Sequence, residues 1–115
     1  MKAKLKSIMS SDCDMKNFSP SHGDSFNLYV QAEIGPDNDN GSNIFGFNIC
    51  NTKWIDENLE SAIFGKGLII VNNYNFEKIK EKIENLCSKI QEDTWNDLAI
   101  RISRYGQWEY EDYKY

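Results

Sequence analysis

The one histidine of the sequence, His22, is the first candidate for catalytic chemistry. Ser21 precedes it and Ser25 follows it closely, so one hypothesis pairs a serine nucleophile with a histidine base. Such a pair needs a geometry that neighbouring positions in a chain do not provide, and no oxyanion-hole motif accompanies it. We therefore expect His22 to be a solvated loop residue and the protein not to be an enzyme.

Three cysteines, Cys13, Cys50 and Cys87, are the other candidate nucleophiles or metal ligands. They are odd in number and widely separated, and none belongs to a Cys-x-x-Cys pair, so neither a disulfide framework nor a zinc site is supported. A cysteine nucleophile would also need a positioned base or an electropositive setting. An enzyme that uses Cys13 or Cys50 with His22 is therefore the weakest hypothesis, and we expect reduced structural thiols, with Cys87 on the apolar face of a helix.

Two further stretches could hold an ion or a cofactor, and both fail in detail. Residues 37–41 are rich in Asp and Asn and end in glycine, as calcium loops are. If Gly41 took the sixth position of such a loop, Pro36 and Phe47 would take the first and twelfth, and neither can coordinate calcium. Residues 65–67, Gly-Lys-Gly, lack the spacing of a phosphate-binding loop. The sequence predicts no metal and no cofactor.

Composition indicates one globular domain spanning residues 1–115, with 40% hydrophobic and 13% aromatic residues. No run approaches the roughly 18 apolar residues of a membrane span, and the amino-terminal residues do not resemble a signal peptide, so we expect a cytoplasmic protein without a membrane partner. The net charge of −5 argues against nucleic acid as a partner, because nucleic-acid binding depends on Lys and Arg side chains that neutralise phosphates.

The alternation of apolar and polar residues predicts the strands that would position a functional surface. Residues 26–34 alternate strictly between apolar and polar side chains, which is typical of a half-buried antiparallel strand at the centre of a sheet. Asn43–Asn51 alternates as well, and we expect the two to form a hairpin in which Ile34 lies opposite Phe45. Residues 2–9 predict a further strand, whose lysines suit a sheet edge, and the fully apolar Leu68–Val71 predicts a short central strand.

Helices are predicted by periods of three and four residues. Asn75 is a good N-cap for an amphipathic helix that runs to about Gln91, and Thr94 is a good N-cap for a second helix that ends near Gly106, where a left-handed residue is expected. The spacing of Ile55, Leu59 and Ile63 predicts a short helix within residues 52–64. The sequence therefore predicts an α+β fold, an antiparallel β-sheet of about four strands covered on one face by two main helices.

One stretch resembles a known family. Residues 103–113, Ser-Arg-Tyr-Gly-Gln-Trp-Glu-Tyr-Glu-Asp-Tyr, resemble the closing signature of the immunity protein 8 family of bacterial polymorphic toxin systems. Residues 1–8, 47–54, 68–76 and 94–95 are similar in outline, so the resemblance covers most of the chain. It implies a protein that binds and neutralises a cognate toxin domain. Within the signature we expect Trp108, Tyr110 and Tyr113 to close the core or pair with a strand edge, with direct contact to the partner as the alternative. Glu109, Glu111 and Asp112 are expected to balance lysines of the first strand.

Acidic residues are concentrated in one quarter of the chain. Residues 33–60 contain six acidic residues and one lysine, a net charge of −5 that equals the charge of the whole chain. Such a surface would attract a basic partner, and toxins that act on nucleic acids, such as nucleases, tend to be basic. With Tyr29 as an aromatic anchor, the predicted partner surface is Tyr29, Glu33, Asp37, Asp39, Asp56, Glu57 and Glu60.

Two other interpretations of these residues stay open. The acidic residues could form a general surface that favours solubility. Alternatively, the outer face of the sheet could carry a small-molecule site in a regulatory module without catalysis, although the polar residues that alternate along that face speak against an apolar pocket.

Overall fold

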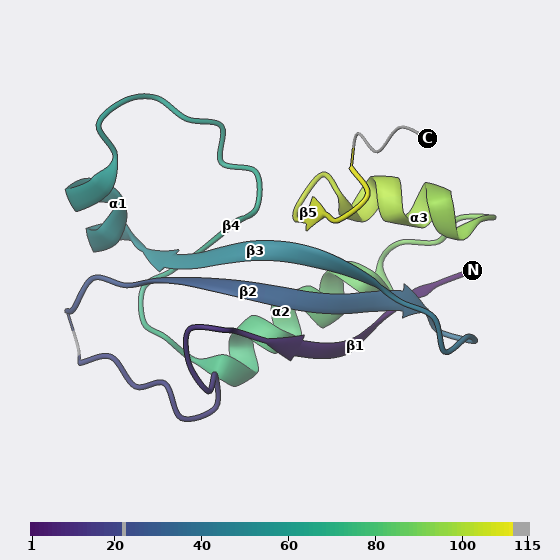
Figure 1. The fold of residues 1–115 in the computed structure, drawn as a ribbon, viewed down its shortest axis with the longest axis horizontal. Coiled ribbons are helices and arrows are strands. Elements are labelled where there is room, and N and C mark those ends of the chain that lie inside the picture. Colours follow the sequence, from purple (N-terminus) through teal and green to yellow (C-terminus); the bar gives the residue numbers. More distant parts are fainter. Residues whose placement is uncertain (22, 112–115) are drawn as a thin grey trace.

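The computed structural model describes residues 1–21 and 23–111, so His22, Asp112 and Tyr113 lie outside the described residues. Within these residues the architecture is α+β, as predicted, with one mixed sheet and three helices (Figure 1). The strands follow the order β1-β2-β3-β4, and the short β5 also pairs with β3. The elements are β1 (Ala3–Met9), β2 (Asn27–Pro36), β3 (Asn43–Asn51), α1 (Thr52–Asn58), β4 (Leu68–Val71), α2 (Phe76–Ser88), α3 (Trp95–Ile102) and β5 (Gln107–Trp108).

The β2–β3 hairpin is the centre of the sheet, as the alternating pattern predicted. The predicted faces are correct, because Val30, Ala32 and Ile34 are fully buried. The predicted register is wrong by two residues, since Phe45 lies opposite Ala32 and Ile34 lies opposite Asn43. A shift of two residues keeps every side chain on its own face, so the apolar pattern alone could not separate the two registers.

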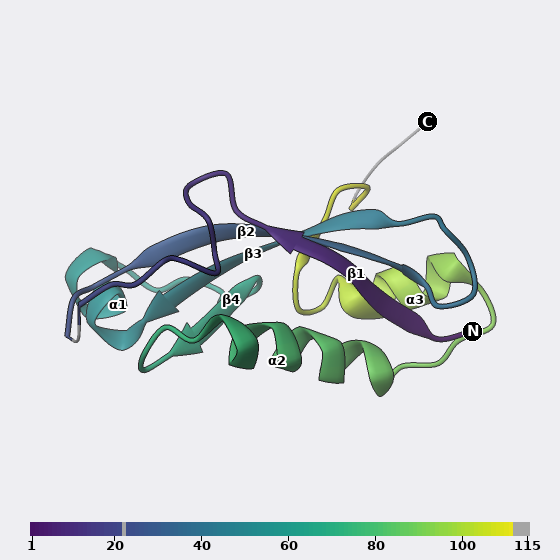
Figure 2. The ribbon, with the colours of Figure 1, turned by 90° about the horizontal axis from the view of Figure 1, so that it is seen from below.

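The two longer helices, α2 and α3, lie on the same side of the sheet (Figure 2). Both predicted caps are present, because the Asn75 side chain accepts a hydrogen bond from the Lys78 amide and Thr94 Oγ1 accepts one from the Asp97 amide. The core is formed between the inner face of the sheet and these two helices. Its fully buried members include Ala32, Ile34, Phe45, Leu98, Ala99 and Ile102.

Two predicted elements differ from the structure. β4 is an edge strand that runs parallel to β3, not a central antiparallel one, and Ile70 on its outer face is half exposed. β4 can run parallel to β3 because the connection between them is long. α1 and the nine-residue loop 59–67 carry the chain from the end of β3 back to Asn48, beside which β4 begins. The predicted helix over residues 52–64 ends already at Asn58, since Leu59 and Ile63 find no surface to pack on and are exposed.

The carboxy-terminal segment closes the core through two tryptophans that share one acceptor. Asn43 Oδ1 accepts hydrogen bonds from Trp95 Nε1 at 2.9 Å and from Trp108 Nε1 at 3.0 Å. The Trp108 ring also stacks on Phe45, with an interplanar angle of 10°. Gly106 is needed for close packing and not for a left-handed cap, because a Cβ there would lie 2.5 Å from the Phe47 ring and its φ is not positive. The core-closing role predicted for Trp108 is therefore confirmed.

Replacing Asn43 with alanine is expected to lower the free energy of unfolding by about 1 to 3 kcal/mol, because two partly buried indole N–H groups lose their acceptor. Urea unfolding measures this change. The matched control is Asn40→Ala, which alters an exposed asparagine in the β2–β3 loop. Equal stability of the two variants would contradict the role assigned to the Asn43 amide.

Candidate functional site

The structure distributes the seven predicted partner-binding residues over two ends of the sheet. Glu33 is near the end of β2, and Asp37 and Asp39 are in the loop between β2 and β3. Asp56, Glu57 and Glu60 lie in and after α1, at the other end of β3 (Figure 1). A strand of nine residues such as β3 spans about 30 Å. The structure therefore does not bring the six acidic residues together into one patch.

The acidic residues at the hairpin end take part in local structure. Asp39 Oδ1 accepts a hydrogen bond from the Gly41 amide at 3.2 Å, and the Asp39 carbonyl accepts one from Lys6 Nζ. Glu33 Oε2 accepts a hydrogen bond from Ser42 Oγ at 3.3 Å. These contacts shape the turn and join it to β1, so this group has a structural role whether or not a partner also uses it.

Tyr29 lies on the outer face of the sheet, on the α1 side of its middle. It is opposite Asn48, and its ring covers Gly46, where an added Cβ would lie 2.5 Å from the Tyr29 hydroxyl oxygen. More than a third of Tyr29 stays exposed. The absence of a side chain at Gly46 thus allows an aromatic ring to lie flat on the sheet with one side open to solvent.

At the α1 end, acidic and apolar side chains are exposed together. Asp56, Glu57 and Glu60 are exposed, and no ion pair of theirs is found among residues 1–21 and 23–111. Loop 59–67 follows α1 and arches away from the sheet (Figure 1). It exposes Phe64 at 99% of its surface and Ile63 at 55%. We call this group the α1–loop surface, and its members are Asp56, Glu57, Leu59, Glu60, Ile63 and Phe64.

Sequence reasoning missed the apolar members of this surface. It assigned Leu59 and Ile63 to the buried face of a helix and gave Phe64 no role. Phe64 is fully exposed beside the half-exposed Ile63, and burying such a ring against a partner would contribute about 1.5 to 3 kcal/mol. The signal in the sequence was an apolar Ala-Ile-Phe run followed directly by Gly-Lys-Gly, a turn-forming stretch that favours a loop.

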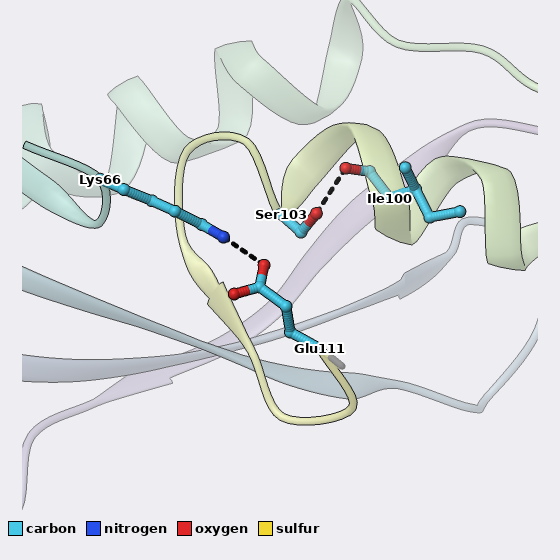
Figure 3. Close-up of polar contacts among 4 residues, drawn as sticks. All are labelled: Lys66, Ile100, Ser103 and Glu111. Atoms are coloured by element: carbon cyan, nitrogen blue, oxygen red, sulfur yellow. Dashed lines mark hydrogen bonds and ion pairs between the residues drawn. The ribbon is translucent and has the colours of Figure 1, made fainter. Parts of the chain in front are cut away.

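The carboxy-terminal segment holds the base of loop 59–67. The Gly67 amide donates a hydrogen bond to the Tyr105 carbonyl at 2.9 Å, and the Gly67 carbonyl accepts one from the Asn48 amide at 2.7 Å. Lys66 forms an ion pair with Glu111, while Ser103 Oγ bonds to the Ile100 carbonyl in the last turn of α3 (Figure 3). Glu111 thus balances Lys66, and the expectation that it balances a lysine of the first strand is wrong.

A groove runs along β4 and α2. Two cavities of about 610 Å³ and 420 Å³ share Ile69, Ile70 and Lys82 as lining residues, so they lie next to each other. We call this feature the β4 groove. Its wall is the edge of β4, and its floor includes Ile83 and Leu86 of α2. This groove is at the side of the sheet and not on the outer face, where the small-molecule interpretation placed a ligand.

Burial disfavours thiolate formation at all three cysteines, which are free thiols. It raises the pKa of Cys87 to about 11, with a smaller contribution from the Glu84 carboxylate, and it also raises the pKa of Cys50. Burial followed by the carboxylates of Asp12 and Asp14 raises the pKa of Cys13. An activated nucleophile requires the opposite shift. Among the described residues, no group of three or more His, Cys, Asp or Glu side chains could hold a metal ion.

Comparison with known proteins identifies a family. The family model described as Immunity protein 8 matches residues 3–113 of the chain. Neither the curated proteins nor the solved structures include a significant match. None of the helices formed by residues 1–21 and 23–111 has the length and apolar character that crossing a membrane requires.

The raised thiol pKa predicts a loss of stability at high pH. The unfolded chain releases the Cys87 proton near its ordinary pKa of 9.0, whereas the folded chain keeps it until about pH 11. The free energy of unfolding contributed by this group is complete below pH 9 and falls as the pH rises to 11. Urea unfolding of the wild type and of Cys87→Ala between pH 8 and 11 measures the effect. The variant should lose less stability across this range, and an identical slope would contradict the assignment.

Proposed function

The chain belongs to the immunity protein 8 family, and on that premise we propose that it binds a cognate bacterial toxin domain and neutralises it as a stoichiometric inhibitor without catalysis of its own. The observation that carries this proposal is the family match over residues 3–113. The partner belongs to a polymorphic toxin system, and neutralisation takes place in the cytoplasm of the producing cell.

An inhibitor of this kind needs an apolar anchor within a polar rim, because a few buried aromatic residues supply most of the binding energy at protein interfaces. The α1–loop surface supports the proposal in this respect. Phe64 projects from the loop with almost its whole surface available, Asp56 and Glu57 lie on the neighbouring helix α1, and Glu60 follows it in the loop. We place the centre of the toxin contact here, with Phe64 inserted into an apolar pocket of the toxin.

Charge supports a basic partner, and a nuclease is the class of toxin that fits best. Carboxylates of the α1–loop surface would occupy positions that the phosphates of a nucleic-acid substrate take in the uninhibited toxin. Opposite charges on two partners raise the rate of association by 10 to 10³-fold at low salt. Tyr29 extends the proposed contact along the sheet, and Glu33, Asp37 and Asp39 would meet the same partner only if it reaches the hairpin end.

Co-expression of the chain with the toxin domain encoded beside it tests the function. The host is expected to survive and the two proteins are expected to co-purify. The control is co-expression of the toxin domain with a truncated, unfolded version of the immunity-family chain, because survival must depend on the folded chain. Death of the host and no complex, with both proteins folded, would contradict the proposal.

Neutralising the charges of the α1–loop surface is expected to slow association with the toxin. In the variant Asp56→Asn/Glu57→Gln/Glu60→Gln, the association rate at low salt should fall about tenfold or more, because electrostatic steering is lost. Stopped-flow or surface-plasmon measurements at several salt concentrations would show a weaker salt dependence than the wild type.

The matched control for this triple variant removes three charges from another part of the surface. Glu77→Gln/Glu81→Gln/Asp93→Asn changes the net charge equally at exposed positions on α2 and in the loop that follows it. An equal effect of both triple variants would assign steering to net charge alone and contradict the placement.

Replacing Phe64 with serine is expected to weaken toxin binding and leave folding unchanged. The dissociation constant should rise about 30-fold, the value for loss of an interface anchor worth about 2 kcal/mol. The free energy of unfolding should stay within about 0.5 kcal/mol, because the ring is 99% exposed. Ile100→Ser, at an exposed apolar position of α3, is the control and should bind as the wild type does. Wild-type affinity of Phe64→Ser would remove Phe64 from the interface.

A further inference from the structure

The two edges of the sheet differ in how they are protected. β1 forms one edge and carries Lys4 and Lys6, with a register irregularity between Leu5 and Ser7. Charged residues and bulges are the usual means of preventing other chains from pairing with an edge strand. β4, at the opposite edge, consists of Leu-Ile-Ile-Val and has neither feature.

On the side of β4 that faces away from β3, backbone amide and carbonyl groups are directed outward, where a further strand could pair with them. The Asn48 amide donates to the Gly67 carbonyl, so Gly67 faces β3, and alternation along a strand turns the amide and carbonyl of Ile70 away from β3. The Leu68 carbonyl faces the same way, while the Leu68 amide is used by the Gly65 carbonyl at 3.1 Å. Among residues 1–21 and 23–111, no strand pairs with this side of β4.

The β4 groove beside this edge has a charge opposite to that of the whole chain. Its lining residues include Lys78, Lys82 and Lys89 and no acidic residue, although the net charge of the chain is −5. None of the three lysines forms an ion pair within the part of the chain that the structure describes. The floor is apolar, with Ile79, Ile83 and Leu86 of α2 among its lining residues. A ligand that is complementary to the groove would therefore have apolar side chains that contact the floor and acidic side chains that pair with the lysines.

We propose that the toxin contributes an extended segment that pairs with the open edge of β4 as an additional strand, with apolar side chains on the floor of the β4 groove and acidic side chains at Lys78, Lys82 and Lys89. Pairing of this kind draws affinity from main-chain hydrogen bonds and specificity from the alternate side chains. The inference rests on the proposed function, because it names the mode by which the same partner binds. The last residue of β4, Val71, pairs with Asn51, the N-cap residue of α1, so β4 runs toward the α1 end of the sheet.

A second copy of this chain fits the edge less well than a toxin segment does. Two copies paired through β4 about a two-fold axis would bring the α2 lysines of both copies to the same side of the joined sheet. This arrangement places like charges together, because the lining of each groove contains lysines and no acidic residue. The free chain is therefore expected to be monomeric.

The test uses the complex of the full chain with the toxin domain encoded beside it. Hydrogen exchange at the Ile70 amide, followed by NMR, should become at least about tenfold slower in the complex, since that amide gains an acceptor. Ile70→Pro removes only an amide that faces away from β3, and a proline is tolerated at such a position. Its affinity for the toxin should fall about tenfold or more, the effect of one lost hydrogen bond and a blocked edge.

Lys82→Glu is the second variant, and it keeps the test decisive if the proline variant fails to fold. Its affinity should fall as well, whereas Lys80→Glu, on the same helix but outside the lining of the groove, should bind as the wild type does. A complex in which Ile70 exchange is unchanged and Lys82→Glu binds normally would overturn the inference and leave the proposed function intact. Absence of any complex would overturn both. A dimer of the free chain that Ile70→Pro disperses, with toxin binding unaffected, would assign the edge to self-association and overturn the inference.

Discussion

The edge of β3 that faces away from β2 is divided between two short strands, and Gly67 lies at the division. β4 pairs with residues 48–51 of that edge in parallel, and β5 pairs with Phe45 and Gly46 in the antiparallel sense. The Gly67 amide binds the Tyr105 carbonyl and the Gly67 carbonyl binds the Asn48 amide, so one residue joins β3, β4 and the carboxy-terminal segment. Its φ of +82° is readily adopted only by glycine, so this position constrains the residue type through its backbone conformation. This junction fixes where loop 59–67 leaves the sheet and where the open edge of β4 begins.

Local signals in the sequence predicted the parts of the fold that depend on local physics. The caps at Asn75 and Thr94 form because a side chain and an amide three residues away are neighbours in any helix start. The faces of β2 follow from alternation. The register, the parallel direction of β4 and its place at an edge could not be predicted, because they depend on contacts between distant segments. A four-residue apolar run has the same pattern in a central strand and in an edge strand.

The candidate site, too, depends on the spatial arrangement of distant segments, which local sequence signals do not predict. Net charge identified the acidic quarter of the chain, but the distance between Asp39 and Asp56 depends on the length of β3, and the two groups lie at opposite ends of it. Phe64 was overlooked because an apolar residue is expected in the core, and only the structure shows that loop 59–67 carries it outward. In contrast, the aromatic signature that first indicated the family contributes Trp108 to the core, where it stacks on Phe45. Trp108, the most recognisable residue of the described part of the signature, thus serves the fold, while the residues of the α1–loop surface are less distinctive.

Stoichiometric inhibition of the toxin by this chain can be measured by titrating the toxin's activity. Purified toxin domain at a concentration far above the dissociation constant is mixed with increasing amounts of the chain, and the remaining activity is measured. A stoichiometric inhibitor will give a linear fall that reaches zero at one chain for each toxin, with activity recovered when the complex is denatured and the toxin refolded. Complete inactivation by a small fraction of one equivalent, or toxin that stays inactive after separation, would indicate a catalytic modification and contradict the account.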